Sequence, residues 1–408
     1  MEKIILKNGI SLIYKKATNT PRVAVCCDIS IGKQETTPGT YAILNRLLTQ
    51  GTQTRNAEQL AEEFEKNGID LYTEMKSDYW KFSALALNED FEIAMELLSD
   101  IMQNSTLENF EKEVTKFKGE TIASLDSPSA KARDTFVENL YKNHQYGHTG
   151  TVILNTIDQI NKEEIKSAYN ALLYNSKKVF SIIGDIEKEK VVEILEKYFG
   201  KFNSTEINNT MFMPELGESK VVTVTKNDVQ QAQIYQGWLV PSHNHEDSPA
   251  LSVLNTILGS SGLSSRLFLE LRDKKGLAYT VRSIYNKNRM CGDFRVYIAT
   301  EPKNIKTSLR GFKIEIDKLK NELVSEKELF DAKNNIIGKL QFLTETNQQK
   351  AGTTAFYELE NLGYEHLEKW IDKINQVSSE DIKRVANMYL GEINMLMVLA
   401  PEKYLAEV

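Results

Sequence analysis

Hydrophobic and polar positions in the N-terminal part of the chain recur with two different periods. Hydrophobic runs at 4–6 and 10–14 flank Asn8-Gly9, a dipeptide typical of a two-residue β-hairpin turn. From residue 39 to residue 50 the period becomes helical. Asn56 is a typical helix N-cap. The pattern predicts strands at 22–31, 69–76 and 79–87, and helices at 56–66, 92–103, 107–125 and 130–141.

Two short motifs occur twice. IDQIN at 157–161 matches IDKIN at 371–375, and LNRLL at 44–48 matches LNTIL at 254–258, with nearly the same offset. The first motif is followed in both copies by a predicted helix and a predicted strand, at 162–173 and 178–183 and at 378–390 and 394–399. The sequence therefore predicts a tandem duplication.

Strands and helices occur in runs instead of alternating strictly, which indicates an α+β fold with two homologous domains, each a mostly antiparallel sheet packed with helices. We predict an N-terminal domain at 1–205 and a C-terminal domain at 220–408. The segment 206–219 between them is rich in Asn, Ser, Thr and Glu and contains Pro214 and Gly217. That composition is typical of an exposed linker.

Composition narrows the function classes. The chain is 41% hydrophobic and 26% charged, as in ordinary globular proteins, and its formal net charge is -7. This mild acidity, without a basic run, argues against nucleic-acid binding. The start of the chain lacks the apolar core of a signal peptide, and no stretch is long enough to span a bilayer. We therefore expect a cytoplasmic protein, no membrane contact, and three reduced, buried cysteines: Cys26, Cys27 and Cys291.

Two segments carry the candidate chemistry: GTYAILNRLLTQGT at 39–52 and SSRLFLELRDKKGLAY at 264–279. With the duplication, they resemble the half-length bacterial branch of the pitrilysin/insulinase-type zinc peptidases. The resemblance covers essentially the whole chain. It implies two α+β domains that form half of a clamshell around a chamber for short or unfolded peptides.

In active members of that family, a helix between a Gly and a Gly-Thr carries His-x-x-Glu-His, whose histidines at i and i+4 bind one zinc ion. Gly39 and Gly51-Thr52 match the flanks, but the His, Glu and His positions are Ala42, Asn45 and Arg46. Ala has no ligand atom, Asn cannot take a proton from water, and Arg is a permanent cation. We therefore predict a degenerate metal site. Glu120, seven residues after Glu113, matches the third ligand by spacing, although an ordinary surface acid has the same pattern.

The second segment matches the family's C-terminal domain signature. The resemblance implies that Arg272 and Tyr279 reach into a zinc site, where they hold the peptide backbone and stabilise the oxyanion. The preceding Gly259, Ser260, Ser261 and Gly262 are interpreted as a short loop, at a place where a relative has a substrate-contacting loop.

Since the metal positions are lost and the Arg/Tyr pair is present, we expect the non-metal-binding subunit of a heterodimeric zinc peptidase, with zinc in the partner. The alternatives are an inert scaffold or peptide-binding protein of the same fold, and a homodimer when the partner is absent. His243 and His245, and His144 and His148, lie in polar turn or loop segments, so we do not expect them to bind a metal.

Overall fold

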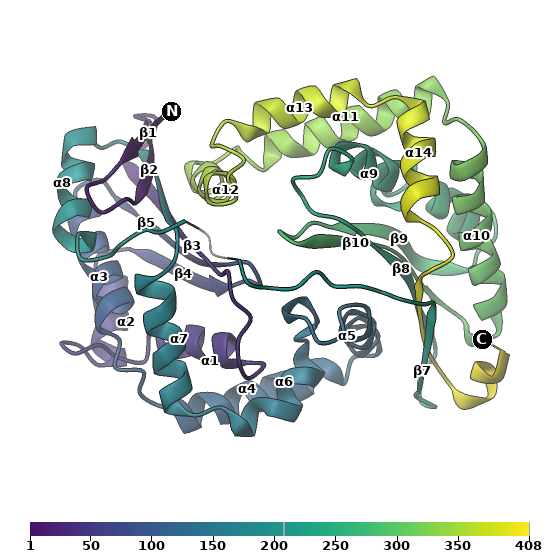
Figure 1. Ribbon diagram of the computed structural model, residues 1–408, viewed down its shortest axis with the longest axis horizontal. Coiled ribbons are helices and arrows are strands. Elements are labelled where there is room, and N and C mark those ends of the chain that lie inside the picture. Colours follow the sequence, from purple (N-terminus) through teal and green to yellow (C-terminus); the bar gives the residue numbers. More distant parts are fainter. Residues whose placement is uncertain (207–208, 408) are drawn as a thin grey trace. The chain divides into compact units, whose positions relative to one another are not determined.

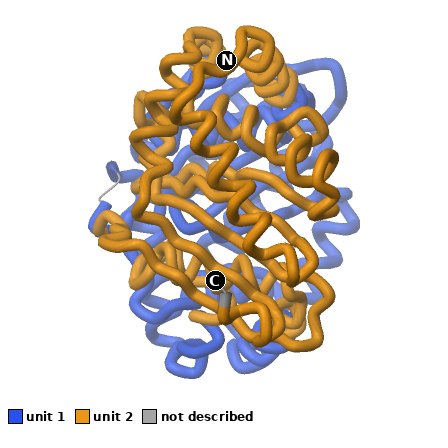
Figure 2. Tube along the Cα trace, turned by 90° about the vertical axis from the view of Figure 1, so that its right-hand side faces the viewer, with its two compact units in different colours: residues 1–120, 153–211, 341–367 blue, residues 121–152, 212–340, 368–408 orange. Residues whose placement is uncertain are grey.

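The computed structural model describes residues 1–206 and 209–407. Figure 2 shows two compact units, one formed by residues 1–120, 153–211 and 341–367, and the other by residues 121–152, 212–340 and 368–408. We call them unit 1 and unit 2. Of the predicted linker, residues 207 and 208 lie outside the described residues, and residues 209–219 form no helix or strand.

Unit 1 is built on a six-stranded sheet in the order β1-β2-β6-β3-β5-β4 (Figure 1). Only the β2–β6 pair is parallel. Its strands are β1 (Glu2–Ile5), β2 (Ser11–Lys16), β3 (Arg22–Ser30), β4 (Asp70–Met75), β5 (Tyr79–Leu87) and β6 (Lys178–Gly184). The helices of the N-terminal half are α1 (Thr40–Leu47), α2 (Ala57–Lys66), α3 (Phe91–Asn104), α4 (Phe110–Leu125), α5 (Pro128–Leu140), α6 (Gly150–Thr156), α7 (Lys162–Tyr174) and α8 (Lys188–Phe199).

Unit 2 is built on a five-stranded sheet in the order β7-β11-β8-β10-β9. Its strands are β7 (Lys220–Thr225), β8 (Ala232–Pro241), β9 (Ala278–Asn286), β10 (Cys291–Thr300) and β11 (Met395–Ala400). The α-helices of the C-terminal half are α9 (Ser248–Asn255), α10 (Ile305–Asn321), α11 (Glu326–Phe342), α12 (Asn347–Leu359), α13 (His366–Gln376) and α14 (Ser379–Tyr389). Two π-helical segments, η3 (Thr256–Ser260) and η4 (Phe268–Asp273), lie between α9 and β9.

The two sheets share one topology. If β1 is set aside, both have the strand order first-fifth-second-fourth-third along the chain, and in both the first and fifth strands are parallel while the other pairs are antiparallel. The α+β fold and the duplication are therefore confirmed. The predicted hairpin, the capped helix after Asn56 and the strand–helix order also agree with the structure. The hairpin turn has three residues, 7–9, and not the two predicted, because Leu6 donates to the backbone oxygen of Ile10.

Each unit also receives one helix from the other half of the sequence. In unit 1, α12 packs on β3 and β6, where Ala351, Ala355 and Leu359 join the core. In unit 2, α5 packs on β8 and β11, with Phe136 and Leu140 buried. The compact units thus differ from the two halves of the sequence. The predicted domain boundaries, 1–205 and 220–408, follow the sequence repeat and stay a prediction.

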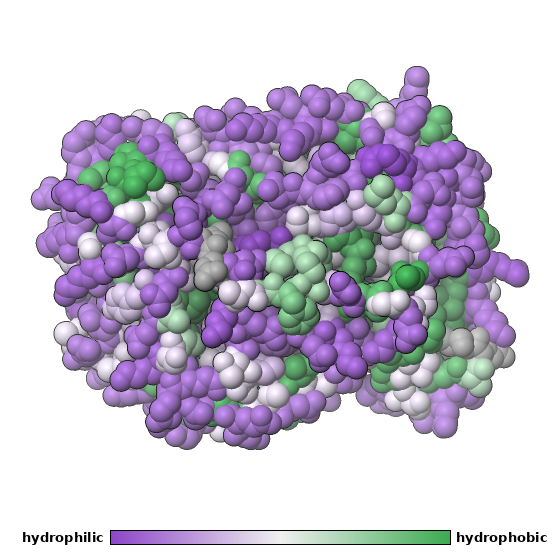
Figure 3. Space-filling view, viewed as in Figure 1, coloured by the Kyte–Doolittle hydropathy of each residue, from purple (hydrophilic) through white to green (hydrophobic). Residues whose placement is uncertain are grey.

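The surface and the cysteines agree with what the composition predicted. On the face shown in Figure 3, hydrophilic residues cover most of the surface and hydrophobic residues form small separate patches. Within the described residues, no helix combines the length and the apolar character that crossing a membrane requires. Cys26, Cys27 and Cys291 are free and buried, as predicted.

Candidate functional site

Helix α1 presents the predicted metal-binding face. Its hydrophobic stripe, Ile43, Leu44 and Leu47, is buried, which leaves Ala42, Asn45 and Arg46 on a half-buried face. Gly39 starts the helix with φ 102°, and a Cβ there would lie 2.6 Å from Ile153. Glycine is therefore required for both its conformation and its contact. Glu35 accepts hydrogen bonds from the backbone of Gly39 and Tyr41, at 3.0 and 2.8 Å, and so satisfies the exposed amides of the first turn.

The guanidinium of Arg46 links α1 to two carboxylates on α4. Its Nε donates to Glu113 at 2.9 Å, and its Nη1 and Nη2 donate to the two oxygens of Glu120 at 2.9 and 3.2 Å. The ring of Phe117 lies 5.8 Å from the guanidinium carbon. The Glu113 side chain is 5% exposed and that of Glu120 is 53% exposed. Hydrogen bonds from Arg46 hold the pKa of Glu120 below its usual value.

Asn45 has a structural partner. Its Oδ1 accepts a hydrogen bond of 2.8 Å from the indole nitrogen of Trp80, which is fully buried in β5. A buried indole N–H needs such an acceptor. Asn45 therefore satisfies the buried N–H of Trp80, at the position where the resemblance implies a general base.

The residues of this face do not fit a zinc ion. Ala42 offers no donor atom, Asn45 is engaged by Trp80, and the cation of Arg46 binds the two carboxylates, including the one at the third ligand position. Across residues 1–206 and 209–407, no group of three or more His, Cys, Asp and Glu side chains is arranged to hold a metal.

Arg272 and Tyr279 lie side by side in unit 2. Arg272 is in the last turn of η4, and its Nη1 donates to the backbone oxygen of Tyr279 at 2.7 Å. The guanidinium carbon lies 4.6 Å from the ring centroids of both Phe268 and Tyr279. Tyr279 is 77% exposed, and its hydroxyl has no hydrogen-bond partner among the described residues. The pair is thus ordered by local contacts while its polar groups stay accessible.

A pocket of about 560 Å³ adjoins this pair. It is lined by Asn255, Gly259, Ser260, Gly262, Leu263, Phe268, Arg272 and residues 279–285. Of the predicted loop at 259–262, Gly259 and Ser260 belong to η3, so the loop interpretation is wrong for these two residues. Gly259 packs closely on β9, since a Cβ on this residue would lie 2.1 Å from the backbone nitrogen of Ser283. The segment is therefore part of the packed structure and not a free loop.

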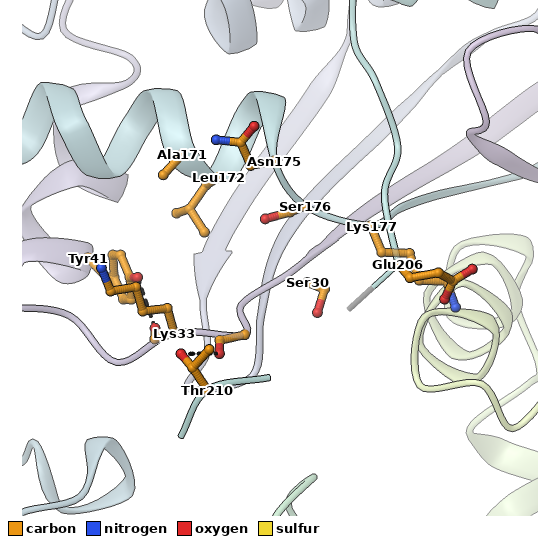
Figure 4. Close-up of a pocket in the computed structure, with 11 residues that line it drawn as sticks. Ser30, Lys33, Tyr41, Ala171, Leu172, Asn175, Ser176, Lys177, Glu206 and Thr210 are labelled. Carbon is orange, nitrogen blue, oxygen red and sulfur yellow. Dashed lines mark hydrogen bonds between the residues drawn. The ribbon is translucent and has the colours of Figure 1, made fainter. Parts of the chain in front are cut away.

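A second pocket, of about 260 Å³, lies in unit 1 between the end of β3 and the end of α7 (Figure 4). Ser30, Lys33, Tyr41 and Asn175 are among its lining residues. Lys177 also lines it, but its ammonium already donates to the backbone oxygens of residues 358 and 359 and to the side chain of residue 361, at 2.9, 3.1 and 2.5 Å. Of the two lysines that line this pocket, Lys177 is thus used to hold the end of α12.

The histidines have structural contacts. Nδ1 of His144 accepts from the backbone of Tyr146 at 3.1 Å, and Nδ1 of His245 accepts from the backbone of Asp247 at 3.1 Å. Both residues therefore act as turn caps.

Comparisons with known proteins agree with this fold. A family model described as insulinase, peptidase family M16, matches residues 11–152, and one described as the peptidase M16 inactive domain matches residues 159–336. The chain belongs to the peptidase M16 family. It is a half-length member with one domain of each type.

Relatives of similar length are named zinc proteases. The uncharacterized zinc protease YmxG of Bacillus subtilis is 25% identical over 98% of both chains. An uncharacterized zinc protease of Rickettsia felis is 27% identical over 97% of this chain and 96% of its own. Among solved structures, a peptidase M16 inactive domain from Pseudomonas fluorescens matches with a TM-score of 0.88 and 21% identity over 98% of both chains. A protease from Helicobacter pylori matches with the same TM-score and 22% identity, over 98% of this chain and 99% of its own.

Two structural features near these candidate residues were not predicted from the sequence. The ion pairs of Arg46 with Glu113 and Glu120 could have been inferred, because the two acids lie seven residues apart on one helix face and Arg46 is the only charge on the facing one. Arg282 on β9, which also lines the pocket of unit 2, carries no motif that marks it.

Proposed function

We propose that this chain is the non-metal-binding subunit of a heterodimeric zinc peptidase. One observation carries the proposal: Arg46 engages both carboxylates of the metal-binding face, whereas Arg272 and Tyr279 remain accessible beside a pocket. The partner is a half-length homologue with an intact His-x-x-Glu-His, and its zinc activates the attacking water. The pair acts in the cytoplasm on short or unfolded peptides.

The roles of Arg272 and Tyr279 follow from their donors. Arg272 uses one amino group to hold the backbone of Tyr279, which leaves the rest of its planar fork for a substrate carbonyl. The unpartnered hydroxyl of Tyr279 donates to the oxyanion that forms at the scissile carbonyl. Both side chains act in trans, at the metal site of the partner.

The pocket suits a peptide backbone. Strand β9 is the last strand of its sheet and pairs only with β10. Its outer edge therefore offers backbone donors and acceptors to an extended chain. The segment Gly259–Gly262 lies at the rim of the same pocket, where it contacts the bound peptide.

The test is zinc-dependent cleavage of a quenched fluorescent peptide by this chain alone, by the partner alone and by the mixture. We expect turnover only in the mixture. Chelator-sensitive cleavage by this chain alone would overturn the proposal. If no preparation cleaves while the two chains still associate, the alternative of an inert scaffold or peptide-binding protein replaces it.

Tyr279→Phe isolates the role of the hydroxyl. We expect turnover of the mixture to fall roughly 10²-fold, the scale of losing one oxyanion donor, with assembly unchanged by gel filtration. Tyr174→Phe, at another exposed tyrosine, serves as the matched control. Equal rates for the two variants would remove Tyr279 from the mechanism.

A further inference from the structure

The pocket beside Arg272 has an unusual charge for this protein. Asp and Glu outnumber Lys and Arg in the chain, 57 to 50. The residues that line this pocket nevertheless include two arginines, Arg272 and Arg282, and no acidic side chain. Clefts lined by one sign of charge concentrate ligands of the opposite sign. The charge of this lining therefore favours an anionic group.

Neither guanidinium is neutralised within the part of the chain that the structure describes. Arg272 donates to a backbone oxygen, and no carboxylate lies within ion-pair distance of it or of Arg282. Elsewhere, semi-buried arginines hold acids: Arg46 binds Glu113, and Arg266 binds Glu328 at 2.8 Å. The pocket arginines thus keep free donors for a ligand.

Arg282 is held in place by aromatic contacts. It lies in the middle of the edge strand β9, and its guanidinium carbon lies 5.6 Å from the ring centroid of Tyr297 on β10. Burial raises the pKa of the neighbouring Tyr235, and Arg282 opposes this rise through its positive charge and a hydrogen bond to the Tyr235 side chain. A guanidinium carries five N–H donors, so Arg282 has donors left to bind a carboxylate while it contacts Tyr297 and Tyr235.

We propose that Arg282 determines specificity by binding a carboxylate of the peptide substrate, either an Asp or Glu side chain or the C-terminal carboxylate. The inference rests on the proposed function, because it takes the occupant of the pocket to be a peptide. It goes further by naming a substrate class and a residue that selects it. Arg272 and Tyr279 act at the scissile bond, whereas Arg282 acts at a distance from it.

The strand geometry fixes that distance. Arg282 follows Tyr279 by three residues in β9, and a strand rises about 3.3 Å per residue, so the two positions are separated by about 10 Å along the strand. An extended peptide beside β9 has the same rise. The selected carboxylate therefore belongs to a residue about three positions from the scissile bond. Its face is not set by strand alternation, because the register of β9 with β10 shifts at Tyr279.

Binding to the purified full-length chain tests the inference without cleavage. Fluorescence anisotropy compares three labelled peptides of equal length: one with Glu and an amidated C-terminus, one with Gln and an amidated C-terminus, and one with Gln and a free C-terminal carboxylate. We expect one carboxylate peptide, or both, to bind roughly tenfold to hundredfold tighter than the neutral peptide, the range of a charge-assisted hydrogen bond. Which peptide gains affinity identifies the source of the carboxylate.

Variants assign the preference to Arg282. Arg282→Gln is expected to remove the difference between the charged and neutral peptides, and Arg282→Lys to keep part of it. Arg310→Gln removes the same charge at an exposed site on α10 that is outside the pocket, and it is expected to keep the whole difference. Equal affinities of all three peptides for the unmodified chain would overturn the inference, as would an equal loss in Arg282→Gln and Arg310→Gln. If Arg282→Gln does not fold, the comparison of peptides on the unmodified chain still decides.

Cleavage by the mixture separates the two proposals. A carboxylate preference in binding without zinc-dependent turnover would overturn the proposed function and support the specificity of the pocket. Turnover whose kcat/KM is the same for Glu and Gln peptides would support the proposed function and overturn the role of Arg282. When both hold, the ratio of kcat/KM for Glu over Gln falls in Arg282→Gln, chiefly through KM.

Discussion

Replacing Arg46 with methionine tests whether its guanidinium stabilises unit 1 by holding the carboxylates of α4. Methionine keeps an unbranched side chain but removes the cation between α1 and α4. Glu113, whose side chain is 5% exposed, then loses its ion-pair partner. The Glu120 side chain is 53% exposed, so water can solvate its carboxylate after the guanidinium is removed.

The size of the effect follows from this difference in burial. Breaking a buried ion pair by removing one partner costs about 3–5 kcal/mol, whereas an exposed pair contributes about 0–1 kcal/mol. The Arg46 side chain is itself 23% exposed. We therefore expect the free energy of unfolding to fall by about 2–4 kcal/mol, carried mainly by Glu113. At about 2–4 °C per kcal/mol for a unit of this size, Tm falls by about 4–16 °C.

A double-mutant cycle isolates the pair. Urea unfolding followed by circular dichroism is measured for the unmodified chain, Arg46→Met, Glu113→Gln and the double variant. We expect a coupling energy of about 1–3 kcal/mol between the two sites. Arg46→Lys, which keeps the charge but loses the bidentate geometry, is expected to lie between the unmodified chain and Arg46→Met. Additive losses would refute the reasoning, because the two side chains would then contribute independently.

Three further predictions follow from local contacts. Gly259→Ala is expected to lower the free energy of unfolding by about 1–3 kcal/mol in urea, because its Cβ would overlap the backbone of β9, whereas Gly338→Ala on α11, with open space around it, is expected to cause no loss. Burial lowers the pKa of His144 from 6.5 to about 4, so between these pH values the folded chain binds fewer protons than the unfolded chain. The free energy of unfolding therefore falls as pH is lowered from 6.5 to 4, by up to about 3 kcal/mol. His144→Gln should flatten this dependence of Tm on pH. The double variant Ala42→His/Arg46→His restores two histidines at i and i+4, so we expect Zn²⁺ binding by calorimetry where the unmodified chain gives no signal.

The sequence predicted the elements whose evidence is local. The turn at Asn8-Gly9, the cap at Asn56 and the helices predicted at 92–103 and 107–125 are specified by neighbouring residues and by a hydrophobic period, and all are present. The second helix begins at Phe110 instead of Leu107, because Leu107 and Asn109 have positive φ. The π-helical segments were not predicted, because a hydrophobic pattern does not specify the register of backbone hydrogen bonds. The exchange of α5 and α12 was also missed, since the pattern of an amphipathic helix shows that it packs on something but not on which sheet.

The site was predicted in part for the same reason. That Ala42, Asn45 and Arg46 offer no zinc ligands can be inferred from residue types alone. The partners that these residues have gained depend on contacts distant in the sequence, from α1 to β5 for Asn45 and from α1 to α4 for Arg46. The role of Arg282 depends on the absence of acids from three separate segments of the pocket lining, which becomes visible only when these segments are brought together.

Charge balance explains how one guanidinium holds two carboxylates on this face of unit 1. One guanidinium neutralises only one of the two carboxylates that it binds. One cation is sufficient because, of these two carboxylates, only that of Glu113 is buried. Burying a charge without a partner costs far more free energy than leaving it in water. Glu120 keeps about half of its surface in water, which solvates the remaining negative charge. The exposure of Glu120 therefore allows one monovalent side chain to hold both carboxylates, and a variant that buries Glu120 more deeply is expected to be less stable.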